Sequence, residues 1–162
     1  MKILFLDDDD ARHEIFADQA KAGGHELFHA HTIDEFAGLI DIHDFDEVWL
    51  DHDLNDFQYE SKGIEMYGNG ELNGTAAARW LVSLLPERRP QKVVIHSWNP
   101  VGAANMQEIL QNGGFDNVVI EEFDQVIYFT RLAEWQKQGK PHKFLEWIVP
   151  EEKLKFLEWK LR

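Results

Sequence analysis

The chain lacks several features that would assign it to common classes of protein. Its 162 residues include no cysteine, which excludes disulfide bonds and thiolate metal sites. There is no run of about 18 apolar residues and no cationic leader followed by an apolar stretch, so we expect neither membrane insertion nor export. The expected location is the cytoplasm. No Gly-x-Gly-x-x-Gly follows the first hydrophobic run and no Gly-Lys-Ser/Thr loop occurs, so dinucleotide cofactors and P-loop nucleotide hydrolysis are not expected.

Basic residues are also few. Sixteen Lys and Arg stand against 30 Asp and Glu, giving a net charge of -14 at pH 7. This charge repels duplex nucleic acid, so we expect no duplex DNA partner. A small phosphate substrate stays possible, because a bound divalent cation can reverse the sign of the local field.

The hydrophobic pattern alternates between short apolar runs and helical segments. Strands are predicted at 2–6, 25–31, 47–50, 93–95 and 118–120, and helices at 11–22, from Thr32 through Ile40, and at 75–85, 101–111 and 123–138. Five such alternations predict a flavodoxin-like, three-layer α/β/α fold with a parallel sheet of order 2-1-3-4-5. This α/β domain is expected to span residues 1–139.

Residues 140–162 fall outside the alternation and are predicted to form a helical C-terminal extension. The tetrad Phe-Leu-Glu-Trp occurs twice there, at 144–147 and 156–159. The extension is expected to pack on the main domain. The alternative is a homodimer contact through its tryptophans.

Three of the predicted strands end in polar clusters. Asp7 to Asp10 follow the first strand, Asp51 to Asp53 the third, and His96 to Asn99 the fourth. The carboxyl ends of parallel strands face one crevice, so these side chains should meet there. Asp7 and Asp8 are predicted metal ligands, whereas Asp9 or Asp10 should cap the following helix.

A direct metal role is open for a wider set of these residues. Asp8, Asp51, Asp53 and His96 could make an oxygen-rich site with one imidazole. Such donors suit Mg²⁺ or Mn²⁺ and suit Zn²⁺ less clearly.

The motifs at the strand ends resemble a known family. Leu-Asp-Asp at 6–8, Leu-Asp-His-Asp-Leu at 50–54 and His-Ser-x-Asn at 96–99 are similar to the cyclic-phosphate processing receiver domains, over residues 1 to about 120. The resemblance implies a receiver-like fold, a divalent metal held by Asp7, Asp8 and Asp51, and action on cyclic or terminal phosphates of nucleotides or RNA ends.

The family derives from signalling receivers. In those receivers the central aspartate, which corresponds to Asp51 here, accepts a phosphoryl group. A lysine after the fifth strand pairs with that phosphoryl group. In this chain Glu121 and Glu122 follow Ile120, and no lysine occurs between Lys92 and Lys137. Two carboxylates there would repel an aspartyl phosphate. Phosphorylation of Asp51 is therefore disfavoured.

Opening a cyclic phosphodiester requires a base, an acid and positive charge on the nonbridging oxygens. His52 and His96 are the candidate acid and base, and neighbouring carboxylates should favour the charged imidazolium of one of them. Ser97, Asn99 and Thr75 are candidates for binding the phosphate, and Asn99 could instead cap the helix that follows. The remaining histidines considered are expected to be surface or structural residues: His25, His29, His31, His43 and His142.

The Gly-rich insert at 55–74 is expected to overhang the same crevice. Phe57, Tyr59 and Tyr67 could stack there on a nucleobase, as part of a lid. A tolerated surface loop is the alternative.

The sequence thus predicts a hydrolase that uses Mg²⁺ or Mn²⁺ and acts on a small nucleotide or RNA-end phosphate. Two alternatives remain: a noncatalytic receiver-like interaction module and a signalling receiver phosphorylated on Asp51.

Overall fold

The computed structural model describes residues 1–54 and 73–142. The chain forms two compact units, Met1–Glu122 and Phe123–Arg162, which are treated separately below. Most of the 55–74 insert and the extension from residue 143 lie outside the described residues. The predicted boundary between residues 139 and 140, the lid and the dimer contact stay predictions.

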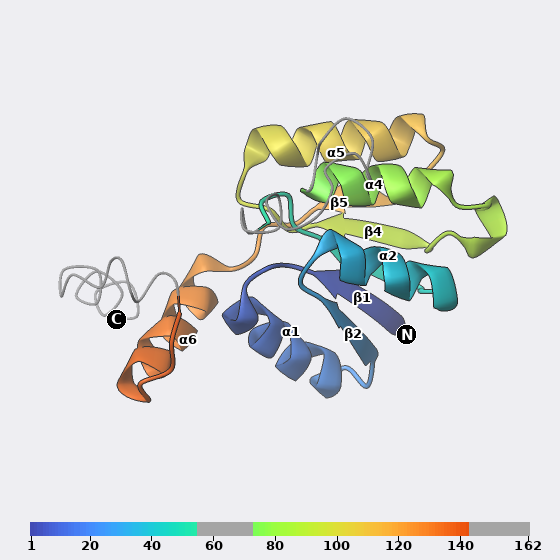
Figure 1. Cartoon of the computed structure of the whole chain (residues 1–162). Coiled ribbons are helices and arrows are strands. Elements are labelled where there is room, and N and C mark those ends of the chain that lie inside the picture. The colour runs from blue at the N-terminus through green and yellow to red at the C-terminus, as the bar shows by residue number, and fades with distance from the viewer. Residues whose placement is uncertain (55–72, 143–162) are drawn as a thin grey trace. The chain divides into compact units, whose positions relative to one another are not determined.

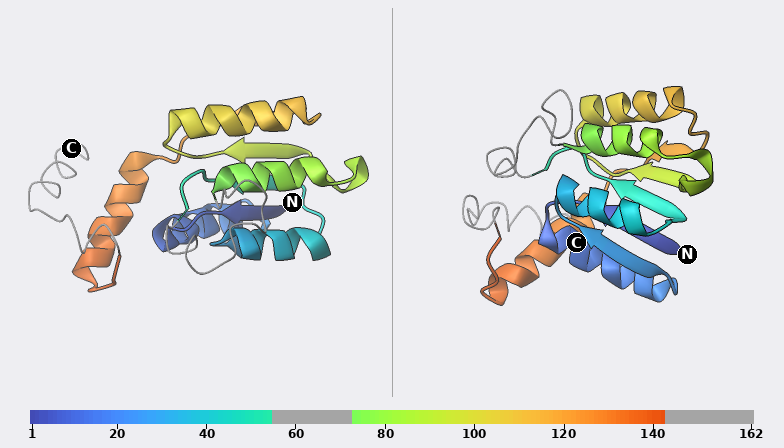
Figure 2. Two further views of the ribbon diagram at one scale, coloured as in Figure 1. Left: turned by 45° about the horizontal axis from the view of Figure 1, so that its top comes forward. Right: turned by 45° about the vertical axis from the view of Figure 1, so that its right-hand side comes forward.

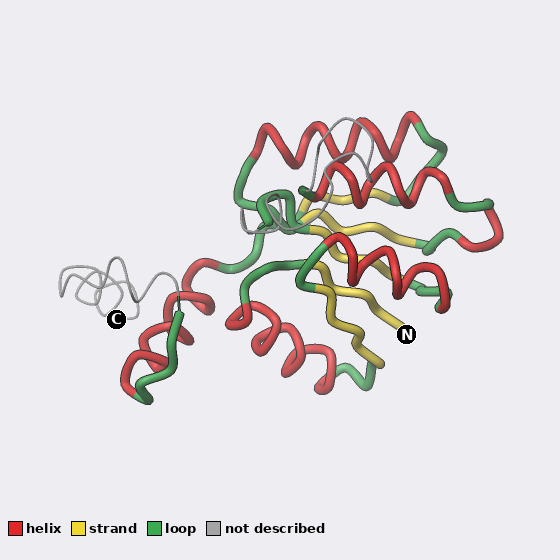
Figure 3. Tube along the Cα trace, in the orientation of Figure 1, coloured by secondary structure: helices red, strands yellow, loops and turns green. Residues whose placement is uncertain are grey.

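The first unit is built on a five-stranded parallel sheet of order β2-β1-β3-β4-β5, which confirms the predicted order (Figures 1 and 3). The strands are β1 (Lys2–Leu6), β2 (Glu26–Ala30), β3 (Glu47–Leu50), β4 (Lys92–Ile95) and β5 (Val118–Ile120). The register pairs Leu6 with Leu50 and Leu50 with Ile95. The residues that directly follow Leu6, Leu50 and Ile95 therefore lie at the same level along the sheet.

The helices follow the expected alternation. They are α1 (Asp10–Ala22), α2 (Ile33–Ile42), α4 (Gly74–Ser83) and α5 (Pro100–Asn112), with a short 3-10 helix, η2 (Pro86–Arg88), before β4. Each α-helix begins after a side chain that accepts a backbone N–H of its first turn; these N-caps are Asp9, Thr32, Asn73 and Asn99.

Helix α4 ends two residues before the predicted end at residue 85. Leu84 and Leu85 are extended, with ψ of 145° and 144°. Pro86 disfavours the helical conformation of the residue before it, so the helix cannot run up to the proline.

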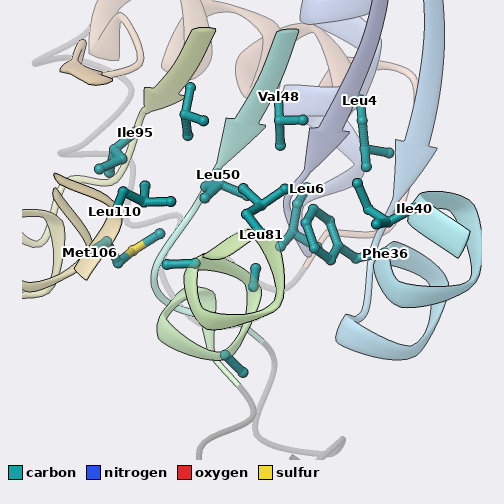
Figure 4. Close-up of a cluster of buried hydrophobic side chains, with 14 of the residues drawn as sticks. Leu4, Leu6, Phe36, Ile40, Val48, Leu50, Leu81, Ile95, Met106 and Leu110 are labelled. Carbon is teal, nitrogen blue, oxygen red and sulfur yellow. The ribbon is translucent and has the colours of Figure 1, made fainter. Parts of the chain in front are cut away.

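Alternation of side chains along the strands divides the core between the two faces of the sheet. On one face Leu4, Leu6, Val48, Leu50 and Ile95 pack against α2, α4 and α5 through side chains such as Phe36, Leu81 and Met106 (Figure 4). On the other face Phe5 stacks on Phe16 of α1, with ring centroids 4.3 Å apart. Helix α1 thus lies on one side of the sheet, and α2, α4 and α5 lie on the opposite side (Figure 2), which gives the predicted three layers.

The described part of the second unit consists of α6 (Gln125–Lys137), capped by Asp124, and the residues after it. Tyr128, Leu132 and Trp135 form its buried side. His142 is buried against two of these rings, with centroids 6.2 Å from Tyr128 and 5.8 Å from Trp135. Among the helices that the structure describes, none has the length and apolar character needed to cross a membrane.

Candidate functional site

The sheet register brings three predicted site residues together. Asp7, Asp51 and His96 directly follow β1, β3 and β4, and all three are buried. One ligand atom from each lies within 4.8 Å of the others. Two carboxylates and an imidazole therefore surround one point at the carboxyl edge of the sheet, as the sequence predicted.

Each aspartate uses one oxygen for the backbone and turns the other to the shared point. Asp7 Oδ1 accepts the N–H of Asp9 at 2.8 Å, and Asp51 Oδ1 accepts the N–H of His52 at 2.9 Å. The second oxygen of Asp7 lies 3.6 Å from Nδ1 of His96. The backbone thus orients both carboxylates.

His96 is held as a neutral imidazole. Its ring stacks on Phe5 at 4.7 Å, and Nε2 donates to the carbonyl oxygen of Leu6 at 3.2 Å. A carbonyl can only accept, so Nε2 carries the hydrogen and Nδ1 directs its lone pair toward Asp7. Burial, and then the positive charge of Arg12, lowers the pKa of His96 to about 3.

Carboxylates were expected to favour the charged imidazolium of one of the two histidines, and His96 is not that one. Removal from water penalises the charged ring, and the positive charge of Arg12 adds to that penalty. A neutral nitrogen that faces a carboxylate oxygen suits a metal ligand better than it suits an acid.

Arg12, on the first turns of α1, belongs to the site although the sequence analysis did not identify it. Its Nη1 lies 3.2 Å from Asp7 Oδ2 and 3.7 Å from Asp51 Oδ2. The guanidinium also lies over the indole of Trp98, with Cζ 4.3 Å from the ring centroid. Its place in the first turn of a helix that starts at a strand end was the only signal in the sequence.

The two buried carboxylates share this one cation and hold protons more tightly than usual. Burial, followed by the charge of Asp51, raises the pKa of Asp7 well above its ordinary value. Burial likewise raises the pKa of Asp51 to about 7, although Arg12 opposes the rise. Near neutral pH the pair therefore gains from a further positive charge.

His52 lies in a second, more exposed group. Its Nδ1 is 2.8 Å from Asp53 Oδ1, and Asn99 Nδ2 lies 3.4 Å from both atoms. The ring packs on the first turn of α5 at Gly102, where a Cβ would overlap it. Asp51 joins the two groups, because its Oδ1 accepts the backbone N–H of His52.

The family model of the cyclic-phosphate processing receiver domain matches residues 2–112. This range includes Asp7, Arg12, Asp51, His52 and His96. The chain belongs to this family. No curated protein matches it.

Solved structures of receiver domains share the fold of this cyclic-phosphate processing receiver domain. A response regulator from Burkholderia pseudomallei, with a phosphorylated aspartic acid and a calcium ion, has a TM-score of 0.53 at 18% identity, covering 85% of this chain and 72% of its own. A CheY-like receiver from Methanospirillum hungatei JF-1 has 0.53 at 19%, covering 85% and 91%. The receiver domain of sensor histidine kinase PA1611 from Pseudomonas aeruginosa PAO1, with magnesium in its active site cleft, has 0.53 at 15%, covering 85% and 92%.

The other aspartates of this family member have separate surroundings. Asp9 is the N-cap of α1, accepting the N–H groups of Ala11 and Arg12, as the sequence predicted for Asp9 or Asp10. Asp10 is exposed and lies 3.0 Å from His31 Nε2. Asp8 is not in the three-residue group, but its charge contributes to raising the pKa values of Asp7 and Asp51. A ligand role for Asp8 or Asp53 stays a prediction.

The predicted phosphate-binding residues shape the loop between β4 and α5 and the start of α4. Ser97 Oγ accepts the N–H of Asn99 at 3.0 Å, and Asn99 Oδ1 accepts the N–H of Gly102 at 3.0 Å. Asn99 therefore caps α5, the second of its two expected roles. Thr75 is buried, and its N–H donates to Asn73. Contact of Ser97, Asn99 or Thr75 with a phosphate stays a prediction.

His13, a buried histidine outside the motifs, contacts the backbone of Asp7. His13 Nε2 lies 2.7 Å from the carbonyl oxygen of Asp7, and His13 Nδ1 lies 2.7 Å from Nδ1 of His29. The ring of His31 stacks on His13 at 3.9 Å. Burial lowers the pKa of His13 to about 3, so it stays neutral and fixes the backbone beside Asp7.

The donor set fits a divalent metal ion. Two carboxylate oxygens and one imidazole nitrogen from buried residues lie within 4.8 Å of one another. Carboxylate oxygens suit Mg²⁺ and Mn²⁺, and an imidazole nitrogen suits transition metals such as Zn²⁺. Asp7, Asp51 and His96 could therefore hold the metal that the sequence predicted.

Proposed function

We propose that this receiver-like domain is a metal-dependent hydrolase that acts on a cyclic or terminal phosphate of a nucleotide or an RNA end. The observation that carries the proposal is the buried group of Asp7, Asp51 and His96. Burial raises the pKa values of both carboxyl groups even with the guanidinium of Arg12 beside them, so their ionised forms would gain from a further cation. This arrangement supports chemistry more than it supports stability.

Asp7, Asp51 and His96 would hold Mg²⁺ or Mn²⁺ in preference to Zn²⁺. When bound, the ion supplies positive charge to the nonbridging oxygens of the phosphate. The chain's own contribution is to orient one oxygen of each aspartate and to keep His96 uncharged through burial.

His52 is the candidate acid and base. The carboxylate of Asp53 only accepts hydrogen bonds, so the imidazole Nδ1 beside it carries the hydrogen and Nε2 has a lone pair. That nitrogen would take a proton from the attacking water as the new P–O bond forms. The resulting imidazolium would return the proton to the leaving sugar oxygen as the old P–O bond breaks. His96 serves this scheme as a ligand, in place of the acid or base role first expected.

Phosphorylation of Asp51 in signalling is the second candidate. It is favoured by the fold and by the buried position of Asp51 at the end of β3. It is opposed by Glu121 and Glu122, both exposed, which follow β5 where a receiver needs its lysine. The third, a noncatalytic interaction module, would use the tryptophan-rich extension, which lies outside the described residues.

Turnover of a 2′,3′-cyclic-phosphate-ended oligonucleotide and of cyclic mononucleotides, with Mg²⁺, Mn²⁺ or Zn²⁺, tests the proposal. His52→Ala should lower turnover by roughly 100- to 10,000-fold, the usual contribution of a positioned acid or base. His25→Ala is the matched control, because His25 precedes β2 at the opposite edge of the sheet. Turnover that survives unchanged in both His52→Ala and His96→Ala would overturn the proposal. Labelling of Asp51 by acetyl phosphate without turnover would favour the signalling receiver.

A further inference from the structure

Arg12 lies against both carboxylates of the proposed metal site. Its Nη1 is 3.2 Å from Asp7 Oδ2 and 3.7 Å from Asp51 Oδ2. In each aspartate, Oδ1 is already engaged by a backbone N–H. The guanidinium therefore lies on the same two oxygens that remain for a cation.

A divalent ion on these oxygens would have the guanidinium as a like-charged neighbour. Positive charges this close repel each other even in water, and more strongly in a buried place. Metal binding must therefore weaken at least one ion pair of Arg12. The guanidinium and the metal compete for the carboxylates.

Two contacts keep Arg12 beside the site when these ion pairs weaken. Its backbone N–H donates to Asp9 Oδ1 at 3.2 Å, which fixes the first turn of α1. Its guanidinium lies over the indole of Trp98, 4.3 Å from the ring centroid, and that contact does not depend on the carboxylates.

Among the described residues that directly follow the five strands, none is a lysine or an arginine. Glu121 and Glu122 follow β5, and no lysine occurs between Lys92 and Lys137. A guanidinium offers parallel N–H groups that match two oxygens of one phosphate. Arg12 has both the position and the geometry for this contact.

We propose that Arg12 is the phosphate-binding cation of the site and that its guanidinium moves from the carboxylates to the substrate phosphate when the metal binds. The inference rests on the proposed metal site of Asp7, Asp51 and His96. Arg12 thus neutralises the two aspartates before the metal arrives and holds the phosphate afterwards, while Trp98 keeps it stacked at the site.

Two binding measurements on the full chain test this exchange, because they should change in opposite directions. In Arg12→Gln, Mn²⁺ should bind at least about fivefold more tightly, the least that loss of a unit charge about 4 Å away gives. Inorganic phosphate should bind the Mn²⁺-loaded variant roughly 10- to 100-fold more weakly, the range for charge-assisted hydrogen bonds. Isothermal titration calorimetry measures both, and circular dichroism checks folding.

Arg12→Lys is the second variant, because it keeps the charge over the buried carboxylates but loses the planar fork. Its Mn²⁺ affinity should stay within about threefold of wild type, since the charge is unchanged, while its phosphate affinity falls. Arg79→Gln is the control: it removes the same charge from an exposed position on α4 and should change neither affinity.

Unchanged or weaker Mn²⁺ binding in Arg12→Gln would overturn the exchange, as would unchanged phosphate binding in Mn²⁺-loaded Arg12→Lys. If Arg12→Gln does not fold, the phosphate affinity of Mn²⁺-loaded Arg12→Lys decides whether the exchange takes place. A wild-type chain that binds no Mn²⁺ would overturn the metal site itself, and with it both proposals. A wild-type chain that binds Mn²⁺ and phosphate while the Arg12 variants match it would overturn only the role of Arg12.

Discussion

At the scale of single residues, burial sets the charge of each group in the site. Asp51 and Asp7 lie with His96 in a place closed to water, so the carboxylates gain protons and the imidazole loses its own. His52 is one residue from Asp51, yet its side chain is 16% exposed and pairs with an exposed carboxylate, Asp53. Neighbours in sequence thus lie in different electrostatic surroundings.

The raised pKa of Asp51 predicts how metal binding and stability depend on pH. In the folded chain Asp51 has a pKa of about 7 against an ordinary value of 3.8, so the folded state binds the extra proton between these values. The contribution of Asp51 to metal-free stability is therefore lost as pH rises toward 7. His96 and His13, with pKa values of about 3 against 6.5, have the opposite effect: their contribution is complete above pH 6.5 and is lost as pH falls toward 3.

A metal must displace the proton from Asp51, so the stabilisation by Mn²⁺ should grow between pH 5.5 and pH 8. Each additional 1 kcal/mol should raise Tm by about 2–4 °C in a chain of this size. Differential scanning fluorimetry with and without Mn²⁺ measures the difference. Asp51→Asn should abolish it, and an equal Mn²⁺ effect on wild type at both pH values would contradict the assigned pKa.

At the scale of elements, helix starts position the site residues. Asn99 caps α5 and brings Gly102 under the ring of His52, while the N–H of Gly74, at the start of α4, donates to the carbonyl oxygen of His52 at 2.9 Å. A Cβ at Gly74 would overlap the carbonyl group of Asp51. Both glycines are needed for close approach and not for an unusual backbone angle.

Gly102→Ala should displace the His52 ring, because the added methyl group would occupy its position. We expect turnover to fall by about tenfold or more, since small displacements of a catalytic group can cost up to about 100-fold. The Mn²⁺ affinity should change little, since Asp7 and His96 lie outside this contact. Steady-state kinetics and Mn²⁺ titration separate the two effects. If Gly102→Ala turns over substrate at the wild-type rate, the proposed acid and base role of His52 is contradicted.

Helix α4 also supplies a test of the core. Leu81 is fully buried, so Leu81→Ala should lower the free energy of unfolding by about 2–5 kcal/mol. Leu85 is 63% exposed, and Leu85→Ala should cost less than about 0.5 kcal/mol. Urea denaturation measures both. Similar losses in the two variants would contradict the packing of α4 on the sheet.

Local signals predicted the elements well and the contacts between them only in part. The cap at Thr32 and the apolar runs identified α2 and the strands, because such signals lie within a few residues. The packing of His52 on Gly102 joins positions 50 residues apart, and the pairing of Arg12 with Asp51 joins positions 39 apart. No periodicity or capping rule encodes contacts of that kind.

At the scale of the whole molecule, the parallel sheet assembles the site. The order β2-β1-β3-β4-β5 followed from the strand and helix alternation, and the register then aligned the residues after β1, β3 and β4. The sequence therefore predicted the meeting of Asp7, Asp51 and His96. The neutral state of His96 and the place of Arg12 depend on packing depth, which the sequence does not display.

The acidic balance of the chain makes the choice of metal probe important. With a net charge of -14, many surface carboxylates bind cations weakly, so total uptake does not report on the site. A variant in which one exposed carboxylate is removed supplies the baseline. Asp10→Asn meets this need, because Asp10 is exposed and only three residues from Asp7.

The most direct test of the account is a count of tightly bound Mn²⁺ per chain by electron paramagnetic resonance, in wild type, Asp7→Asn, Asp51→Asn and the Asp10→Asn control. The account predicts one tight ion in wild type and in Asp10→Asn, and its loss in Asp7→Asn and in Asp51→Asn. Absence of a tight ion in the wild type, or equal binding in all four proteins, would contradict it.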